Sequence, residues 1–454
     1  MENRIDLTKG GITEKLIKLS LPIMGTSFIQ MAYNMTDMMW VGRIGSRAVA
    51  AVGTAGFYPW LAMAFVMISK IGGEVKVSQS IGKNNISDTK NYIKSAIEIN
   101  IILSCLYTLA LILFKDNLIG FFRLTDTGVV SMSKNYLVII AFGMIFYFIN
   151  PVFTAIFNGL GNSKTPFLIN TIGLITNIIL DPILIFGIGF IPRLGVAGAA
   201  IATVSAQMIV SFCFLFMIIK SKEEYFKIKL FRNININYYK ILYKLGIPVA
   251  FQSGLFTAFS MILGVIVASW GPVGVAAQKV GSQIEAISWM TSEGFAVALS
   301  SFVGQNYGAK EYFRVNKGSK IAIIIAALWG VLTTLILVFG GNKIFSLFIA
   351  ESDAIQKGGM YLKIIGYSQL FSCLEIVIGG AFKGLGRTYI PSIVSITLTG
   401  ARIPLAYIIS KPEFLGLNGV WWSISISSVL KGILMICIFT YLLKHKKLYT
   451  VSDE

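Results

Sequence analysis

Long apolar segments constrain this chain more than any other feature of its sequence. Segments such as Ile101–Leu113, Leu137–Phe157 and Ile321–Phe339 approach or reach the roughly 20 apolar residues with which a helix crosses a bilayer. Hydrophobic residues make up 55% of the chain and charged residues 13%, which is about half the charged fraction of a typical soluble domain. The alternation of apolar and polar residues expected of outer-membrane strands is absent. The sequence therefore predicts an all-α integral membrane protein.

The apolar segments predict twelve transmembrane helices. Their expected ranges are 15–39, 50–77, 95–114, 133–157, 166–189, 195–219, 239–269, 274–303, 318–340, 359–382, 390–410 and 417–443. The net charge is +18, and most of the Lys and Arg fall in loops on one side of these spans, above all between residues 220 and 244. Since cytoplasmic loops carry the excess of Lys and Arg, both termini are expected in the cytoplasm. The basicity is a topology signal, and no nucleic-acid-binding surface with stacking aromatics is expected.

The first apolar segment is too long for a cleavable signal peptide and lacks a small-residue cleavage site behind it. The four cysteines, Cys105, Cys213, Cys373 and Cys437, all lie in apolar spans. Their spacing fits neither a metal site nor a disulfide framework. We expect them to be small core residues.

The two halves of the chain repeat one another. Leu21-Pro22 at the start of the first span corresponds to Ile247-Pro248 at the start of the seventh, 226 residues later. Four further matches follow in the same order at nearly the same offset: residues 45–51 with 271–277, 80–84 with 302–306, 157–161 with 382–386, and 195–198 with 416–419. Because each half has an even number of spans, the repeat is parallel. We expect an N-terminal lobe (1–219), a basic cytoplasmic linker (220–238) and a C-terminal lobe (239–454).

Two parallel six-helix repeats related by a pseudo-two-fold axis along the membrane normal are typical of one class of secondary transporter. Such a pair of lobes can enclose a cavity that opens to either side in turn. The repeat therefore indicates a transporter, although a fold alone does not identify its substrate.

Ionisable side chains within the spans are costly and are therefore functional candidates. In the first span Asp37 shares a helix face with Gln30 and Asn34. In the fifth span Asn177 and Asp181 are four residues apart and also share a face. These oxygens can bind Na⁺, and two neighbouring carboxylates in a low dielectric can equally hold a proton. The residues alone leave both ions open.

Proline marks two points at which these helices can bend. Pro182 directly follows Asp181 and frees a backbone carbonyl one turn earlier. Pro22 lies near the start of the first span. We expect hinges at Pro22 and Pro182.

Several motifs resemble the multidrug and toxic compound extrusion (MATE) family over essentially the whole chain. They are residues 21–24, 33–37 and 41–45 in the first helix, 158–166 at the fourth-to-fifth helix junction, 177–187 in the fifth helix, and 303–306 and 384–388 in the second half. The resemblance implies a twelve-helix exporter of organic cations and other amphiphiles, driven by exchange for H⁺ or Na⁺. It implies a cation-coupling role for Asp37, Asn177 and Asp181, with Asn34 beside them and Thr203 as a further oxygen ligand.

The second half departs from the first. The positions equivalent to Asp37 and Asn177 are Leu263 and Arg402, and the seventh span lacks the carboxylate that one branch of the family places there. Five other charged residues within the second-half spans, together with Gln30, are candidates for substrate contact or gating: Lys279, Glu285, Glu293, Glu375 and Arg402.

The sequence thus predicts a multi-pass antiporter of a bacterial inner membrane that acts as a monomer, without an ATPase partner or a bound cofactor. An alternative is a lipid-linked oligosaccharide flippase of related architecture, in which Lys279 and Arg402 would contact the pyrophosphate. An enzyme is not expected, since the one histidine, His445, lies in the C-terminal tail and no paired DDxxD-type magnesium motif is present. No Walker motif indicates nucleotide binding either. The exported compounds and the choice between H⁺ and Na⁺ stay open.

Overall fold

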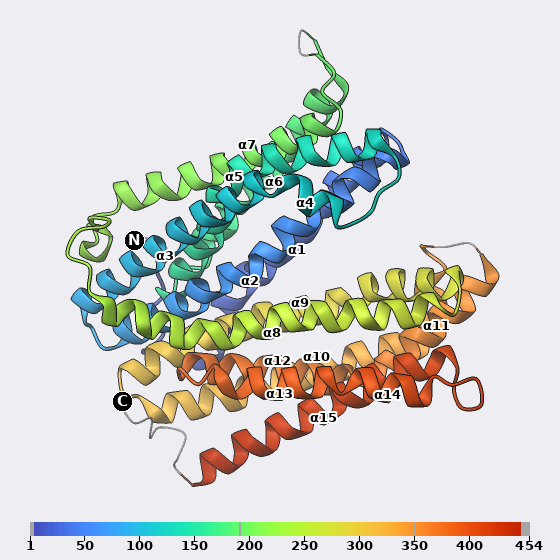
Figure 1. Ribbon diagram of the computed structural model, residues 1–454. Helices are drawn as coiled ribbons and strands as arrows, with labels where there is room; N and C mark the ends of the chain where they lie inside the picture. Colours follow the sequence, from blue (N-terminus) through green and yellow to red (C-terminus); the bar gives the residue numbers. More distant parts are fainter. Residues whose placement is uncertain (1–3, 190–191, 349–350, 446–454) are drawn as a thin grey trace. The chain divides into compact units, whose positions relative to one another are not determined.

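The computed structural model describes residues 4–189, 192–348 and 351–445, and the regular structure of this part of the chain is helical (Figure 1). The helices are α1 (Ile12–Gly42), α2 (Ser46–Gly82), α3 (Ile86–Leu113), α4 (Lys115–Gly120), α5 (Thr127–Gly159), α6 (Lys164–Phe186), α7 (Val196–Lys220), α8 (Ile236–Ala268), α9 (Pro272–Gly308), α10 (Tyr312–Phe345), α11 (Ser352–Gly366), α12 (Gln369–Gly384), α13 (Tyr389–Gly400), α14 (Arg402–Ile409) and α15 (Leu417–Lys444), with a 3-10 turn, η1, at Glu224–Phe226. The prediction of an all-α protein is confirmed.

Nine spans among the described residues are long and apolar enough to cross a membrane, counting α13 and α14 together as one. The pair α11 and α12, bent by 51° at a short break, makes a tenth. The two other long helices, α1 and α9, are more polar because they carry Gln30, Asp37, Lys279 and Glu285. Together these elements correspond to the twelve predicted spans.

Equivalent glycines in the two halves show why the sequence repeats. Gly45 (φ 133°) and Gly271 (φ 93°) precede α2 and α9, while Gly161 (φ 83°) and Gly386 (φ 78°) follow α5 and α12. L side chains rarely adopt such positive φ angles, so these turns favour glycine. The repeated glycines therefore mark the same chain reversals in each half.

The contacts divide the chain into two units. Unit 1 contains residues 4–6 and 21–250, and unit 2 contains residues 7–20 and the described residues from 251 onward. The first turns of α1 thus belong to unit 2 and the first turns of α8 to unit 1. The lobe boundaries expected from the sequence stay a prediction.

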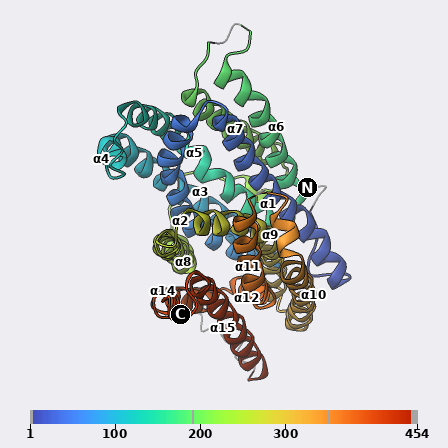
Figure 2. The same ribbon diagram turned by 90° about the vertical axis from the view of Figure 1, so that its right-hand side faces the viewer.

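In unit 1, α5 is the central helix, in contact with α2, α3 and α7 (Figure 2). Its aromatic residues supply much of the core: Phe153 and Phe157 both pack against Phe214 of α7, with ring centroids 5.4 and 5.6 Å apart. Glycine allows α5 and α7 to approach closely, because a Cβ on Gly143 would lie 2.4 Å from the Val204 side chain. Small residues at helix contacts are typical of membrane bundles.

Unit 2 is built around α9, α12 and α15, with α10 and α11 against them. Trp421 is fully buried, packs edge-on against Tyr361, and donates a hydrogen bond to Gln278 Oε1 at 3.1 Å. The segment before α1 is fixed to this unit by Arg314, which donates to the carbonyl oxygens of Leu7 (3.0 Å) and Gly10 (2.9 Å).

The cysteines are free, and the expectation that all four are core residues is wrong for two of them. Cys373 is buried, whereas Cys105 and Cys437 are exposed on helix faces. An exposed face of a membrane helix is as apolar in composition as a core, so composition alone does not separate the two environments.

The close approach of α8 to α2 gives a test of this packing. A Cβ on Gly246 would lie 1.8 Å from the carbonyl oxygen of Ile68, whereas one on Gly53 would meet no atom within 4 Å. We expect Gly246→Ala to destabilise the protein by about 1–3 kcal/mol through overpacking. Gly53→Ala, the matched control in α2, should leave the melting temperature in detergent unchanged or raise it. Equal melting temperatures of the two variants would contradict this packing.

Candidate cation-coupling site

Unit 1 brings the three predicted coupling residues together. Asn177 Nδ2 of α6 donates to Asp181 Oδ1 at 3.1 Å, and both side chains are completely buried. Asp37 of α1 is partly exposed and close enough to Asp181 for the two carboxylates to interact electrostatically. The site therefore joins α1 to α6 within one unit.

Several oxygens at this site are buried without a hydrogen-bond partner among the described residues. They are Asp37 Oδ1, Asn177 Oδ1, Asp181 Oδ2 and Thr203 Oγ1. A buried polar atom left unsatisfied costs about 1–3 kcal/mol. Since three of the four can only accept, a cation, a proton or a donating water molecule could satisfy them.

Tyr33, which the sequence analysis did not select, connects α1 to this cluster. Its hydroxyl donates to the carbonyl oxygen of Thr203 at 3.4 Å and lies within electrostatic reach of Asp37 and Asp181. Tyr33 lies four residues before Asp37, on the same helix face, so its spacing could have identified it. Tyr136 of α5 also interacts electrostatically with both carboxylates, but nothing in its sequence context signals this.

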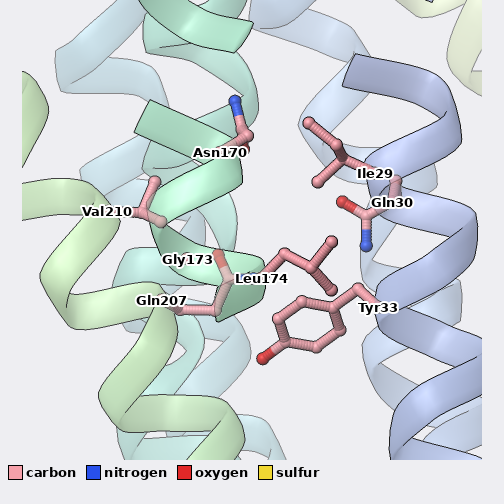
Figure 3. A pocket seen from close by; sticks show the side chains of 8 residues that line it. All are labelled: Ile29, Gln30, Tyr33, Asn170, Gly173, Leu174, Gln207 and Val210. Atoms are coloured by element: carbon pink, nitrogen blue, oxygen red, sulfur yellow. The ribbon is translucent and has the colours of Figure 1, made fainter. Parts of the chain in front are cut away.

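A small pocket lies beside the cluster between α1, α6 and α7 (Figure 3). Its lining residues are Ile29, Gln30, Tyr33, Asn170, Gly173, Leu174, Gln207 and Val210. Asn150 of α5 supports its wall by donating to Gln207 Oε1 at 2.8 Å and accepting from Ser211 Oγ at 2.6 Å. Of the stripe predicted on α1, Gln30 and Asn34 are both exposed, and only Gln30 lines the pocket.

The two predicted hinge prolines lie inside helices. Pro22 lies about three turns after the start of α1, and Pro182 lies one turn before the end of α6. Because proline has no N–H, Pro182 leaves the carbonyl of Ile178 without its helical donor. This places a backbone acceptor one residue after Asn177. The hinge roles stay predictions.

Three of the five charged residues selected in the second half converge in unit 2. Glu285 accepts hydrogen bonds from Tyr361 (3.1 Å) and Gln369 (3.2 Å). Arg402 is buried and donates to the hydroxyls of Ser427 (2.6 Å) and Ser428 (3.0 Å). Glu375 forms an ion pair of 2.8 Å with Lys431.

These groups form one electrostatic cluster that contains two carboxyl groups and two basic side chains. Arg402 interacts with both Glu285 and Glu375, and Lys431 does the same. Lys431 had no role assigned from the sequence, since it lies alone on α15 with no charged neighbour at helical spacing. The remaining two candidates, Lys279 and Glu293, are exposed on α9 and lie outside this cluster.

Comparison with known proteins places these features in a family. The MatE family model matches residues 22–183 and 248–408, together more than two thirds of the chain. The chain belongs to the MATE family. The second match begins 226 residues after the first, which is the spacing of the repeat seen in the sequence.

Individual MATE relatives are similar over nearly their whole length. The probable multidrug resistance protein NorM of Thermotoga maritima is 27% identical over 429 residues, covering 94% of this chain and 92% of the relative. The probable multidrug resistance protein YoeA of Bacillus subtilis is 26% identical over 423 residues, covering 91% and 90%. A crystal structure of a MATE transporter in the bent conformation has a TM-score of 0.90 at 22% identity and covers 98% of both chains.

Membership of the MATE family confirms several predictions. The chain is a multi-pass membrane transporter with bacterial relatives, and it is not an enzyme. The MATE fold is shared as well, as the structural match shows. Of the two pyrophosphate contacts expected for the flippase alternative, Arg402 is buried among two hydroxyls and two carboxylates and Lys279 is exposed on α9.

The Glu375–Lys431 pair gives a stability test of the MATE C-terminal half. The two side chains are 13% and 8% exposed, so removing one partner leaves the other charge buried and unpaired. We expect Glu375→Gln or Lys431→Met alone to destabilise the protein by about 3–5 kcal/mol.

The double variant is the control for this test. Removing both charges together should cost less than the sum of the single changes, because no unpaired charge is left. Thermal unfolding of the three variants in one detergent measures this difference. Strict additivity would show that the pair does not act as a unit.

Proposed function

We propose that this protein is a secondary-active efflux antiporter that exports organic cations and amphiphiles in exchange for a monovalent cation bound by Asp37, Asn177 and Asp181. The observation that carries the proposal is the group of four unpaired buried oxygens around these residues. The names of the relatives from Thermotoga maritima and Bacillus subtilis, both probable multidrug resistance proteins, support the class of substrate.

The number of unpaired acceptors favours Na⁺ over H⁺ as the coupling ion. A proton on one carboxylate supplies a single donor and satisfies one neighbouring acceptor. A hard cation is coordinated by several oxygens at once and can satisfy Asp37 Oδ1, Asn177 Oδ1 and Asp181 Oδ2 together. Thr203 Oγ1 and the carbonyl of Ile178 would complete the ligand set.

Ion binding at this site can act on α1. The two carboxylates repel each other when both are charged and no cation is present, and a cation between them would draw α1 toward α6. Helix α1 contacts α7 through the hydrogen bond from the Tyr33 hydroxyl to the Thr203 carbonyl and carries Pro22 within its length. An ion can drive transport only if it binds one conformation more tightly than another, and α1 is the element whose position the ion would select.

The membrane potential and the ion gradient would together drive this exchange. Each monovalent cation that moves inward contributes about 2.3 kcal/mol per 100 mV of membrane potential, in addition to its own concentration gradient. The protein would act as a monomer in the inner membrane with both termini in the cytoplasm. This orientation rests on the distribution of Lys and Arg among the loops.

Ethidium efflux from proteoliposomes tests the proposal. We expect efflux under an inward Na⁺ gradient and its loss in Asp37→Asn and Asp181→Asn, because each change removes a charge from the proposed ion site. Glu413→Gln, an exposed carboxylate between α14 and α15, is the matched control and should transport normally. Efflux driven by a pH gradient alone would identify H⁺ as the ion. Normal efflux by Asp37→Asn would sink the assignment of the site.

A change at Thr203 tests the choice of ion more directly. Thr203→Val keeps the side-chain shape but removes an oxygen. We therefore expect the Na⁺ concentration for half-maximal efflux to rise roughly tenfold, equivalent to a loss of about 1.4 kcal/mol in ion binding. The Na⁺ concentration for half-maximal efflux, measured beside wild type, provides the comparison. An unchanged value would remove Thr203 from the ligand set.

A further inference from the structure

The segment between α7 and α8, residues 221–235, is fixed to unit 1 through its backbone. The fully buried Glu98 of α3 accepts from the backbone N–H of Phe231 and from the hydroxyl of Tyr239. Lys94, one turn earlier on α3, donates to the carbonyl oxygens of Arg232 and Asn233. The segment also buries Tyr225 and Phe226, and Phe226 packs against Phe157 of α5. These contacts give the segment a defined conformation, which we call the docked linker.

The same contacts leave apolar side chains of the docked linker exposed. Phe231 (φ 56°) and Asn233 (φ 52°) adopt the left-handed conformation, which is disfavoured for residues with a Cβ. Four apolar side chains within or next to this turn are exposed: Leu230 41%, Phe231 50%, Ile234 58% and Ile236 58%. Glu98 thus holds the backbone of Phe231 in a disfavoured conformation while the Phe231 side chain stays exposed. Backbone strain of this kind is typical of functional positions.

Basic side chains alternate with these apolar ones. Lys227, Lys229 and Arg232 are exposed within the docked linker, and Lys240 is exposed in the first turn and a half of α8. The backbone of Arg232 is held by Lys94, so its guanidinium does not carry the docking contact. Apolar side chains interleaved with Lys and Arg are the composition of segments that lie at a lipid–water interface.

The position of the docked linker in the chain places it close to the lipid headgroups. It joins Lys220, the last residue of the membrane-spanning α7, to Ile236, the first residue of the membrane-spanning α8 (Figure 1). It therefore lies on one side of the membrane, at the ends of two spanning helices, where lipid headgroups are within reach. Anionic headgroups complement its cations, and the acyl boundary complements Phe231 and Ile234.

We propose that the docked linker is a binding surface for anionic lipids, with the apolar side chains around Phe231 inserted at the acyl boundary and Lys227, Lys229 and Arg232 contacting the headgroups. The surface fixes one end of unit 1 to the membrane plane. The first turns of α8 belong to unit 1 and its later turns to unit 2. The lipid-bound linker would hold the start of α8 in place while its later turns move.

Site-directed spin labelling in proteoliposomes tests this surface. On a background with the four cysteines replaced by Ser or Ala, single cysteines are introduced by Phe231→Cys and Ile234→Cys and spin-labelled. Asn235→Cys, at an exposed polar position of the same linker, is the matched control. The collision rates of each label with oxygen and with a water-soluble nickel complex report its depth. The liposomes contain phosphatidylcholine alone or phosphatidylcholine with phosphatidylglycerol.

We expect a severalfold higher oxygen-to-nickel ratio at positions 231 and 234 than at 235 in the liposomes with phosphatidylglycerol, and a loss of this difference in phosphatidylcholine alone. The triple change Lys227→Gln, Lys229→Gln and Arg232→Gln should abolish the dependence on phosphatidylglycerol, since it removes the cations without touching the backbone contacts of Glu98 and Lys94. Nickel access at 231 and 234 equal to that at 235 would overturn the insertion. Equal depth in both lipid compositions would overturn the recognition of anionic headgroups.

Discussion

The constraint on which this structure depends is the cost of leaving a polar group unsatisfied in a lipid-embedded helix bundle. Water is not available to complete a hydrogen bond there, so each buried polar atom has to find its partner within the protein. Unit 2 pairs its buried charged groups internally, although some of its hydroxyl and amide oxygens have no partner among the described residues: Lys431 pairs with Glu375, two serines hold Arg402, and Tyr361 and Gln369 donate to Glu285. Unit 1 does not, since Asp37, Asn177 and Asp181 each retain a buried oxygen without a partner.

This difference between the halves arises from a few substitutions in an otherwise repeated framework. The reversals before α2 and α9, and those after α5 and α12, share positive-φ glycines at equivalent positions. The positions equivalent to Asp37 and Asn177, however, hold Leu263 and Arg402. In place of the oxygen cluster that we propose to bind a cation from outside, unit 2 thus contains basic side chains of its own. A lobe that carries its own counter-charges has little to gain from an additional ion, and this asymmetry favours unit 1 as the half that responds to the coupling ion.

Much of this fold was predictable because its determinants are local. Apolar runs fix where α2, α5 and α10 lie, and the repeated Gly45 and Gly161 fix the reversals between helices. The pairing of Asn177 with Asp181 was predictable as well, since helical spacing alone brings the two side chains together. The Glu375–Lys431 pair was not, because it joins α12 to α15 across a distance in sequence that no spacing rule covers. The exposure of Asn34 was likewise hidden, since the sequence shows that a helix has a polar side but not which neighbours that side meets.

The segments that precede α1 and α8 show how a repeated fold can connect its two halves. Residues 7–20 are fixed to unit 2 by Arg314 through the carbonyls of Leu7 and Gly10, and the docked linker is fixed to unit 1 by Lys94 and Glu98. In each case the anchor lies on the third long helix of its half, α10 or α3, and holds main-chain atoms of the segment. Each of the two helices that follow, α1 and α8, therefore begins in one unit and continues in the other, with a proline close to the change (Pro22 and Pro248). Because proline removes one backbone hydrogen bond at that point, bending there costs less than bending elsewhere in either helix. An ion that changes the position of α1 in unit 1 would therefore act on a helix whose first turns belong to unit 2. The backbone of α1 would thus carry the effect of ion binding from one half to the other.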